Sequence, residues 1–309
     1  MSKIERLKLR KERNASTLEN KNNTKQLSSQ NSKGLIAYEN KNYDAALNGL
    51  NDYAKKYPDG KYVIEANYQV ADIYNNRKDF KNAVTYYEAV AAKAPNKYAE
   101  LSALQAARIS YFELKDYATA EKYFTQLKDI AVTTDNKLES MRGLLRCQYK
   151  LGKFADAVPN AQELLQQKGL ATDDKMMANM VVAKNYQNNN QLDDASATYK
   201  QVVALGKSEY SAEARYRVAE ILLAQNRLPE AEKASFEVIN KAGSYDYWIT
   251  KAYILLGDVY YKEQDYFNAE ATLKSVSENA ADETLRKEAQ DKLAVVVAEK
   301  NKNSKVGTQ

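Results

Sequence analysis

The sequence predicts an all-α solenoid of about seven helix-turn-helix repeats, closed by a C-terminal capping helix. Two observations support this fold class. From Lys33 onward, a pattern of small and large apolar residues returns every 36 to 38 residues. The 309-residue chain also contains only ten Gly and four Pro, with 44% hydrophobic and 28% charged residues, which is typical of a helical protein. Because a repeat array grows by stacking, we expect one elongated domain.

The repeats can be followed through a small residue that opens each expected second helix. These residues are Ala46, Ala83, Ala120, Ala157, Ala195, Ala231 and Ala269. Three positions before each stands a large apolar residue: Tyr43, Phe80, Tyr117, Phe154, Leu192, Leu228 and Tyr266. A small side chain is needed where two helices approach closely, so the pattern predicts where each second helix begins.

The most complete copy of the repeat lies in residues 253–273. Its pattern residues are Tyr253, Leu256, Gly257, Tyr260, Ala269 and Leu273. This spacing resembles the tetratricopeptide (TPR) repeat, a helix-turn-helix unit. The resemblance implies a right-handed α-α superhelix, in which the first helix of each repeat lines the concave wall. Arg108 and Leu145 replace the small first-helix residue in repeats three and four, so we expect these two to be the least regular.

The pattern divides the chain into four segments. We expect a disordered basic and polar segment at 1–32, seven TPR-like repeats at 33–281, a capping helix at 282–300 and a disordered tail at 301–309. Pro229 falls in the first turn of a second helix, where proline is tolerated. Pro159 lies deeper in its helix and predicts a kink or a late helix start.

The residues available for chemistry are few. The chain has no His, which removes the commonest general base and metal ligand. Its one cysteine, Cys147, lies in an apolar-rich helix, where an inert buried thiol is expected. No glycine-rich phosphate loop is present. We therefore expect no catalytic residues, no metal site and no cofactor, and a protein that is not an enzyme.

The net charge of +5 is concentrated at one end. Residues 1–30 carry eight Lys/Arg and three Glu, so residues 31–309 balance at 38 against 38. A neutral repeat region gives no reason to expect nucleic-acid binding. Neither a signal peptide nor a transmembrane span is found, which predicts a cytoplasmic location for the chain as given. If the chain is part of a longer exported protein, a periplasmic or outer-membrane-associated location is expected instead.

The resemblance implies that a protein or peptide partner lies along the first helices. The residues that we expect to contact it are Tyr68, Asp72, Phe112, Arg142, Arg146, Tyr149, Lys184, Tyr216, Glu220, Asp258 and Tyr261. Arg142 and Arg146 lie one helical turn apart, and with Lys184 they are expected to grip an acidic segment. The alternative is that these cations are solvated and paired with neighbouring acids.

Residues 53–90, with the linker pattern Tyr-Pro-x-x-x-Tyr, resemble TPR modules of bacterial cell-envelope proteins. This favours a protein-interaction scaffold in cell-envelope assembly. The alternative function is a structural module that self-associates, and the oligomeric state is left open. Trp248, placed in a loop, is an exposed aromatic that suits either function unless it packs against the next repeat.

Overall fold

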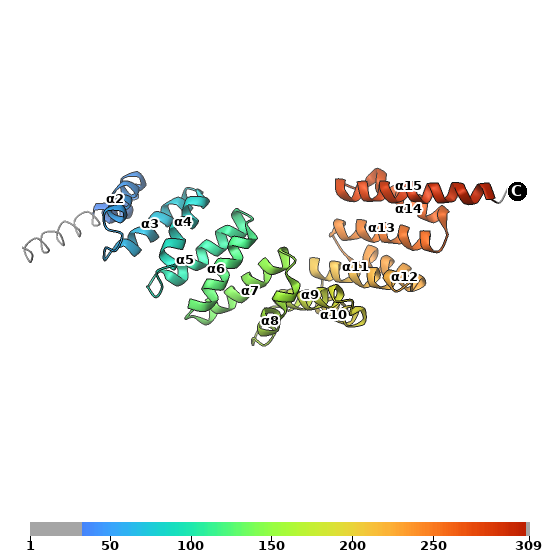
Figure 1. The fold of residues 1–309 in the computed structure, drawn as a ribbon, viewed down its shortest axis with the longest axis horizontal. Coiled ribbons are helices and arrows are strands. Elements are labelled where there is room, and N and C mark those ends of the chain that lie inside the picture. Colours follow the sequence, from blue (N-terminus) through green and yellow to red (C-terminus); the bar gives the residue numbers. More distant parts are fainter. Residues whose placement is uncertain (1–32, 307–309) are drawn as a thin grey trace, which may run out of the picture. The chain divides into compact units, whose positions relative to one another are not determined.

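The structure is a computed structural model that describes the backbone of residues 33–306 and the side chains of residues 33–302. This part of the chain consists of helices and connecting turns, with no strand. Figure 1 labels the helices along the chain. The predicted N-terminal segment 1–32 and residues 307–309 of the predicted tail lie outside the described residues.

The helices alternate between a first and a second helix of each repeat. The first helices span residues 33–39, α3 (Val63–Asn76), α5 (Ala99–Arg108), α7 (Thr134–Lys150), α9 (Thr172–Asn188), α11 (Glu209–Ala224) and α13 (Asp246–Lys262). The second helices are α2 (Tyr43–Lys56), α4 (Phe80–Ala91), α6 (Tyr117–Ile130), α8 (Phe154–Leu165), α10 (Leu192–Leu205), α12 (Leu228–Lys241) and α14 (Tyr266–Asn279). A last helix, α15 (Glu283–Val306), follows.

Each second helix begins at the large apolar residue that the repeat pattern marks. The alanine three positions later is fully buried in all seven repeats. In the seventh repeat, a Cβ added to Gly257 would lie 2.6 Å from Cγ of Leu273. The equivalent pair in the first repeat, Gly34 and Leu50, is nearly as close at 2.9 Å. Close helix contacts therefore explain why small residues recur at these positions.

The turn inside each repeat is built in the same way. Two positions before the second helix the backbone has a positive φ of 55° to 70°, at Lys41, Lys78, Lys115, Gly152, Asn190, Asn226 and Gln264. A left-handed residue ends a helix because its N–H can reach back to the last carbonyls. The N–H of Gln264 donates to the Tyr261 carbonyl, and that of Asp265 to the Tyr260 carbonyl. The Asp265 side chain then caps α14 by accepting from the Asn268 N–H.

Two prolines lie inside second helices. Pro229 lies in the first turn of α12, as predicted. Pro159 lies within α8, which nevertheless starts at Phe154, so the late start that was one of two expectations is wrong.

Repeat three is irregular, as predicted. Its first helix, α5, ends at Arg108 and continues as a π-helical turn, η1 (Ile109–Glu113). The Leu114 N–H donates to the Ile109 carbonyl, five residues back. Arg108, which replaces the expected small residue, reaches Glu139 on α7 at 2.9 Å. The side chain that breaks the pattern thus joins two successive first helices.

The chain forms two compact units, where one array was expected. Unit 1 ends at Leu151 and unit 2 begins at Gly152, in the turn of the fourth repeat. Within each unit, successive helices pack against one another as in a helical-repeat solenoid. The predicted all-α solenoid fold is therefore confirmed.

The end of unit 2 is covered by α15. Leu285, Ala289 and Val296 of this helix are buried against α14 residues that include Leu273 and Val276. The helix therefore provides the predicted cap. It continues to Val306, six residues beyond the predicted boundary at 300.

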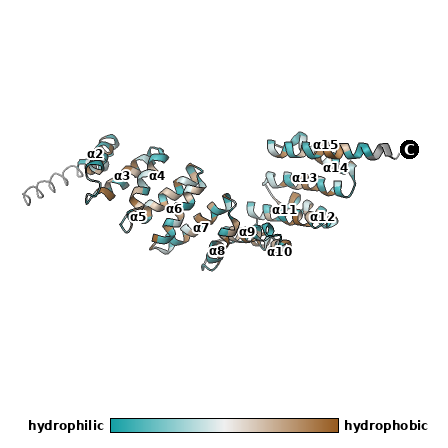
Figure 2. Ribbon diagram, viewed as in Figure 1, coloured by the Kyte–Doolittle hydropathy of each residue, from teal (hydrophilic) through white to brown (hydrophobic). Residues whose placement is uncertain are grey.

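Figure 2 shows hydrophilic and hydrophobic residues interleaved along the helices. Within the described part of the chain, none of the helices is long and apolar enough to span a bilayer.

Candidate functional site

All eleven residues expected to contact a partner lie on first helices or on the π turn that extends one. Unit 1 contains Tyr68 and Asp72 on α3, Phe112 in η1, and Arg142, Arg146 and Tyr149 on α7. Unit 2 contains Lys184 on α9, Tyr216 and Glu220 on α11, and Asp258 and Tyr261 on α13. The expected trio of Arg142, Arg146 and Lys184 is therefore divided between the two units.

In unit 1, a phenol joins the first two repeats. The Tyr38 hydroxyl donates to Oδ2 of Asp72, and the Asn76 amide donates to the same oxygen at 3.2 Å. Burial raises the pKa of the Tyr38 phenol, and the hydrogen bond and negative charge of Asp72 raise it further. Tyr38 therefore stays a neutral donor, which fixes the orientation of the Asp72 carboxylate.

Aromatic rings also lie along the first helices of unit 1. Tyr68 stacks on Tyr98 with ring centroids 4.4 Å apart. The Tyr98 hydroxyl donates to Glu65 at 2.8 Å, which orders the outer ring of the stack. Phe112 is 49% exposed and lies edge-on to Tyr111. The first helices of unit 1 thus offer ring faces beside the charged groups of Asp72 and of the Arg108–Glu139 pair.

On α7, Arg142, Arg146 and Tyr149 are all half-buried. Their spacing of three to four residues puts them on one side of the helix. Cys147, between them in sequence, is fully buried, and burial raises the pKa of its thiol to about 12. A thiol with this pKa is a poor nucleophile at neutral pH.

The corresponding wall of unit 2 is held by ion pairs. The Lys184 ammonium donates to Oε1 of Glu213 on the next first helix. Arg217 contacts Glu213 at 3.3 Å and Glu220 at 2.9 Å. The amide of Gln187, on α9, donates to Glu220 at 2.9 Å. These contacts connect α9 with α11 through four charged groups.

Burial and charge act differently on the groups of this network. Burial lowers the pKa of the Lys184 ammonium, more than the adjacent Glu213 raises it. Burial alone would raise the pKa of Glu220, but the charge and hydrogen bond of Arg217 outweigh it and lower that pKa. Glu220 and Arg217 are therefore firmly ionised, whereas Lys184 is charged at the cost of desolvation.

Two further pairs extend the array from α13 to α15. Lys251 lies 3.2 Å from Glu288, and Asp258 lies 2.8 Å from Lys292. Burial raises the pKa of Asp258, and Lys292 partly counteracts this effect. We call the whole set the charge ladder; it comprises Lys184, Glu213, Arg217, Glu220, Lys251, Glu288, Asp258 and Lys292.

Two buried aromatic residues pack against cations of the charge ladder. Tyr216 is only 4% exposed, and its ring lies 5.5 Å from that of Trp248, which is also buried. Lys251 lies over the Tyr216 ring, and Arg217 over the Trp248 ring. Tyr216 therefore positions the cations and does not itself offer a free ring. Trp248 lies in the first turn of α13 and not in an exposed loop, and it packs against Tyr216 of the preceding repeat where packing against the next one was expected.

The three charged residues predicted in unit 2 thus prove to be members of ion pairs. Lys184, Glu220 and Asp258 each bond to another side chain of the wall, while Tyr261 is half-buried and lies edge-on to Tyr266. The partners Glu213, Arg217, Glu288 and Lys292 were missed. The i, i+3 and i, i+4 spacings of Arg217 with its two glutamates were a usable signal.

The ladder can orient polar groups but has no metal-binding character. No group of three or more His, Cys, Asp or Glu that could hold a metal ion occurs within residues 33–302. Its charges alternate in sign and sum to zero over the eight residues. Such an array suits a partner surface of mixed charge better than a uniformly acidic one.

Known proteins share this architecture. Models of the tetratricopeptide repeat match residues 33–60, 64–96 and 183–247. No curated protein sequence matches the chain. The solved structure of PilW, described as a widely conserved type IV pilus biogenesis factor, is 17% identical, covers 76% of this chain and 98% of its own, and has a TM-score of 0.51.

A second solved structure is equally similar. The C-terminal part of a TPR repeat-containing protein from Cytophaga hutchinsonii is 17% identical, covers 84% of this chain and 98% of its own, and has a TM-score of 0.51. At this identity both structures show a shared fold only. The family assignment rests on the three repeat matches, which identify tetratricopeptide repeats in residues 33–60, 64–96 and 183–247 of this chain.

Proposed function

We propose that this protein is a non-enzymatic interaction scaffold that binds a segment of a partner protein along the first helices of unit 2. The observation that carries the proposal is the charge ladder, which runs over three successive first helices, α9, α11 and α13, and the capping helix α15. Ion pairs join α9 to α11 and α13 to α15, and Arg217 pairs with two glutamates within α11, so charged groups are held at fixed positions.

The ladder keeps surface for a partner. The side chains of Lys251, Asp258 and Lys292 remain 20% to 33% exposed although each is paired. An ammonium carries three donors and a carboxylate about four acceptor sites, so one ion pair does not exhaust either group. Because these groups are ordered before binding, a partner does not have to supply the free energy of ordering them.

The decisive experiment exchanges the two residues of one ion pair in the charge ladder, so that the pair can still form with its charges reversed. In Asp258→Lys with Lys292→Asp, the ion pair can re-form but the exposed charges exchange places. We expect unchanged helicity and loss of partner proteins captured from the native cell, measured by quantitative mass spectrometry. The matched control is Arg227→Glu with Glu230→Arg, an exposed pair outside the ladder. Equal capture by both variants would contradict the proposal.

An acidic partner is a finer proposal that concerns unit 1. It rests on Arg142 and Arg146, one turn apart and half-buried on α7. The variant Arg142→Glu with Arg146→Glu should weaken binding of an acidic peptide measured by calorimetry, without altering the melting temperature. Equal affinity of wild type and variant would remove α7 from the acidic-partner proposal.

We also propose that the scaffold acts in bacterial cell-envelope assembly. The resemblance of residues 53–90 supports it, and PilW, described as a type IV pilus biogenesis factor, has the same fold. Fractionation of the native cell tests it, because the protein should appear with envelope fractions. Self-association is the rival function; light scattering at several concentrations would show a mass that rises with concentration.

A further inference from the structure

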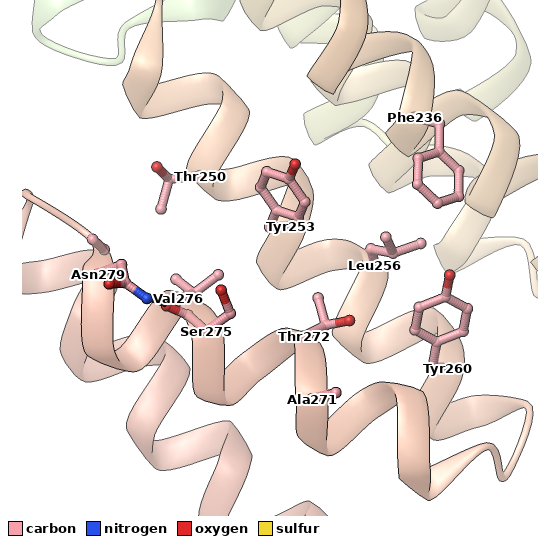
Figure 3. Close-up of a pocket in the computed structure, with 11 residues that line it drawn as sticks. Phe236, Thr250, Tyr253, Leu256, Tyr260, Ala271, Thr272, Ser275, Val276 and Asn279 are labelled. Carbon is pink, nitrogen blue, oxygen red and sulfur yellow. Dashed lines mark hydrogen bonds between the residues drawn. The ribbon is translucent and has the colours of Figure 1, made fainter.

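A second surface of unit 2 is an apolar groove. It is lined by Phe236 on α12, by Tyr253, Leu256 and Tyr260 on α13, and by a row of α14 residues. Figure 3 shows these side chains around one hollow. The groove encloses about 530 Å³, and a second hollow of about 340 Å³ continues it, sharing Thr250, Asn279 and Ala280.

Small side chains create the groove. Ala271, Thr272 and Ser275 of α14 face the space between the larger rings of α12 and α13. Leu256 and Val276 are buried and form the floor, whereas Phe236 and Tyr253 remain 41% and 38% exposed. Exposed rings beside a hollow are typical of a surface that receives apolar side chains.

The groove and the charge ladder lie on opposite sides of α13. At about 100° per residue, Tyr253 and Tyr260 point about 160° away from Lys251 and Asp258. A partner in the groove therefore does not compete for the rungs of the ladder. The groove does not rest on the function proposed for the ladder.

Both ends of the groove carry carboxylates, and at one end the Arg286 guanidinium also donates to the Ala280 carbonyl at 3.0 Å. Asp246 and Asp282 are the charged residues among those that line the two hollows. Hydrogen bonds from Thr284 and Leu285 lower the pKa of Asp282, which keeps its carboxylate ionised. At the other end, the Tyr260 hydroxyl donates to Glu232 at 3.1 Å.

Two more carboxylates stand near Glu232. Burial raises the pKa of Glu263, and the negative charges of Glu232 and Asp265 raise it further. The groove thus has an apolar centre between two negatively charged ends. The complementary ligand carries apolar side chains in the middle and positive charge at both ends.

We propose that the α12–α14 groove docks a short amphipathic helix of a partner protein, with apolar residues on one face and Lys or Arg at both ends. From Ile249 to Tyr260 the groove follows eleven helical steps, about 16 Å, which corresponds to about three turns of a bound helix. Apolar side chains at i, i+4 and i+7 would then enter the hollow.

The test uses the full chain and designed peptides of about twelve residues. The first peptide has Leu at i, i+4 and i+7 and two Lys at each end. The second has the same composition in scrambled order, and the third has Glu in place of the terminal Lys. Fluorescence anisotropy should show the tightest binding for the first peptide. Equal binding of all three, or no binding of the first, overturns the proposal.

Two variants with matched controls locate the site. Ala271→Arg places a long cation in the groove and should weaken binding of the first peptide at least about tenfold. Its control is Ala197→Arg, because Ala197 is exposed at the equivalent position of α10. Asp246→Lys should weaken the Lys-flanked peptide and strengthen the Glu-flanked one. Glu209→Lys, at the equivalent first position of α11, should do neither.

Three outcomes distinguish a partner helix in this groove from a peptide bound elsewhere and from a second copy of the chain. The Asp258/Lys292 exchange in the ladder should leave peptide affinity unchanged, so the two proposals can fail independently. Equal loss in Ala271→Arg and Ala197→Arg, with unchanged helicity, would place the peptide on another surface. Self-association of the wild type that Ala271→Arg abolishes would show that a second copy fills the groove, which overturns a partner helix.

Discussion

The two units stabilise the same helical repeat with different side-chain chemistry. In unit 1, Tyr38 binds Asp72 and Tyr68 stacks on Tyr98, so rings and hydroxyl groups connect successive first helices, alongside the partly exposed Arg108–Glu139 ion pair. In unit 2, Lys184 binds Glu213 and Asp258 binds Lys292, so charges connect them. The backbone pattern therefore leaves the choice of cross-helix contact open.

The difference predicts different sensitivity to mutation. Losing one hydroxyl from an aromatic wall removes a single net hydrogen bond, whereas removing one partner of a buried ion pair leaves an uncompensated charge. Unit 2 should therefore be the more fragile. Trp248 is the single tryptophan and lies in unit 2, so its emission reports that unit, while circular dichroism reports both.

The largest effect is expected from truncation after Asp282, which removes α15. Burying Leu285 and Val296 contributes ~1.5–3 kcal/mol each, and the helix also carries Glu288 and Lys292 of the ladder. This is a large share of a typical stability of ~5–15 kcal/mol. Trp248 emission should shift as in the unfolded protein, while part of the helicity persists.

A control truncation after Lys302 should leave both signals unchanged, because it retains the contacts of α15 that the structure describes. If the protein truncated after Asp282 shows the same Trp248 emission transition as the wild type, α15 does not act as a cap. Loss of all helicity together with the emission change would show that the two units are not separable in stability.

The next effect concerns the most buried rung. Glu213→Gln should destabilise unit 2 by ~3–5 kcal/mol, since it leaves Lys184 and Arg217 without their shared carboxylate. The side chains of Lys184 and Glu213 are only 13% and 9% exposed, which makes solvent a poor substitute. Replacing both, as Lys184→Met with Glu213→Leu, should cost far less. Denaturant melts followed by Trp248 emission measure both.

The control for this series is Glu230→Gln. Its partner Arg227 is half exposed, and exposed pairs contribute ~0–1 kcal/mol. A Glu213→Gln protein as stable as this control would mean that water already screens the ladder.

A smaller effect is expected in unit 1 from Tyr38→Phe. The change removes the donor to Asp72, which keeps its bond from Asn76 and partial access to water. The cost should be ~0.5–1.5 kcal/mol. It should appear in the circular dichroism melt and leave the Trp248 transition in place. A cost as large as that of Glu213→Gln would remove the contrast between the walls.

The smallest expected effect is a difference in the alkaline pH at which the two units unfold. Burial raises the pKa of tyrosines in unit 1 (Tyr38, Tyr68, Tyr86, Tyr87, Tyr98, Tyr111 and Tyr123) and in unit 2 (Tyr199, Tyr216 and Tyr260). A phenol with a raised folded pKa contributes stability below its unfolded pKa of ~10. That contribution is lost as the pH rises above this value.

Lys184 acts in the opposite direction. Its pKa is lowered in the folded chain, so its desolvation cost is relieved as the pH rises through that lowered value towards the unfolded one. Unit 1, with more such tyrosines and no such lysine among its described residues, should therefore unfold at the lower pH. In a pH titration, helicity should begin to fall before Trp248 emission changes. Simultaneous changes would contradict this order.

The sequence alone determined the positions of the repeats. It located every second helix, although it placed the opening at an alanine three residues after the observed first residue. It also identified that alanine as a close-packed position and the close approach at Gly257, because these features depend on helical periodicity and on contacts within one repeat. The composition of the α15 face likewise identified a cap. Local spacing is sufficient for such features since neighbouring helices meet at fixed intervals along the chain.

Only the tertiary structure decided which side chains meet between repeats. Lys184 donates to Glu213, which is 29 residues away in the sequence, and Lys292 donates to Asp258, which is 34 residues away. The buried state of Tyr216 and Trp248, and the hollow between Phe236 and Tyr260, also depend on the register and rotamers of adjacent helices. A one-dimensional pattern shows which face a residue occupies. Its partner is determined by how far one helix is shifted and rotated against the next.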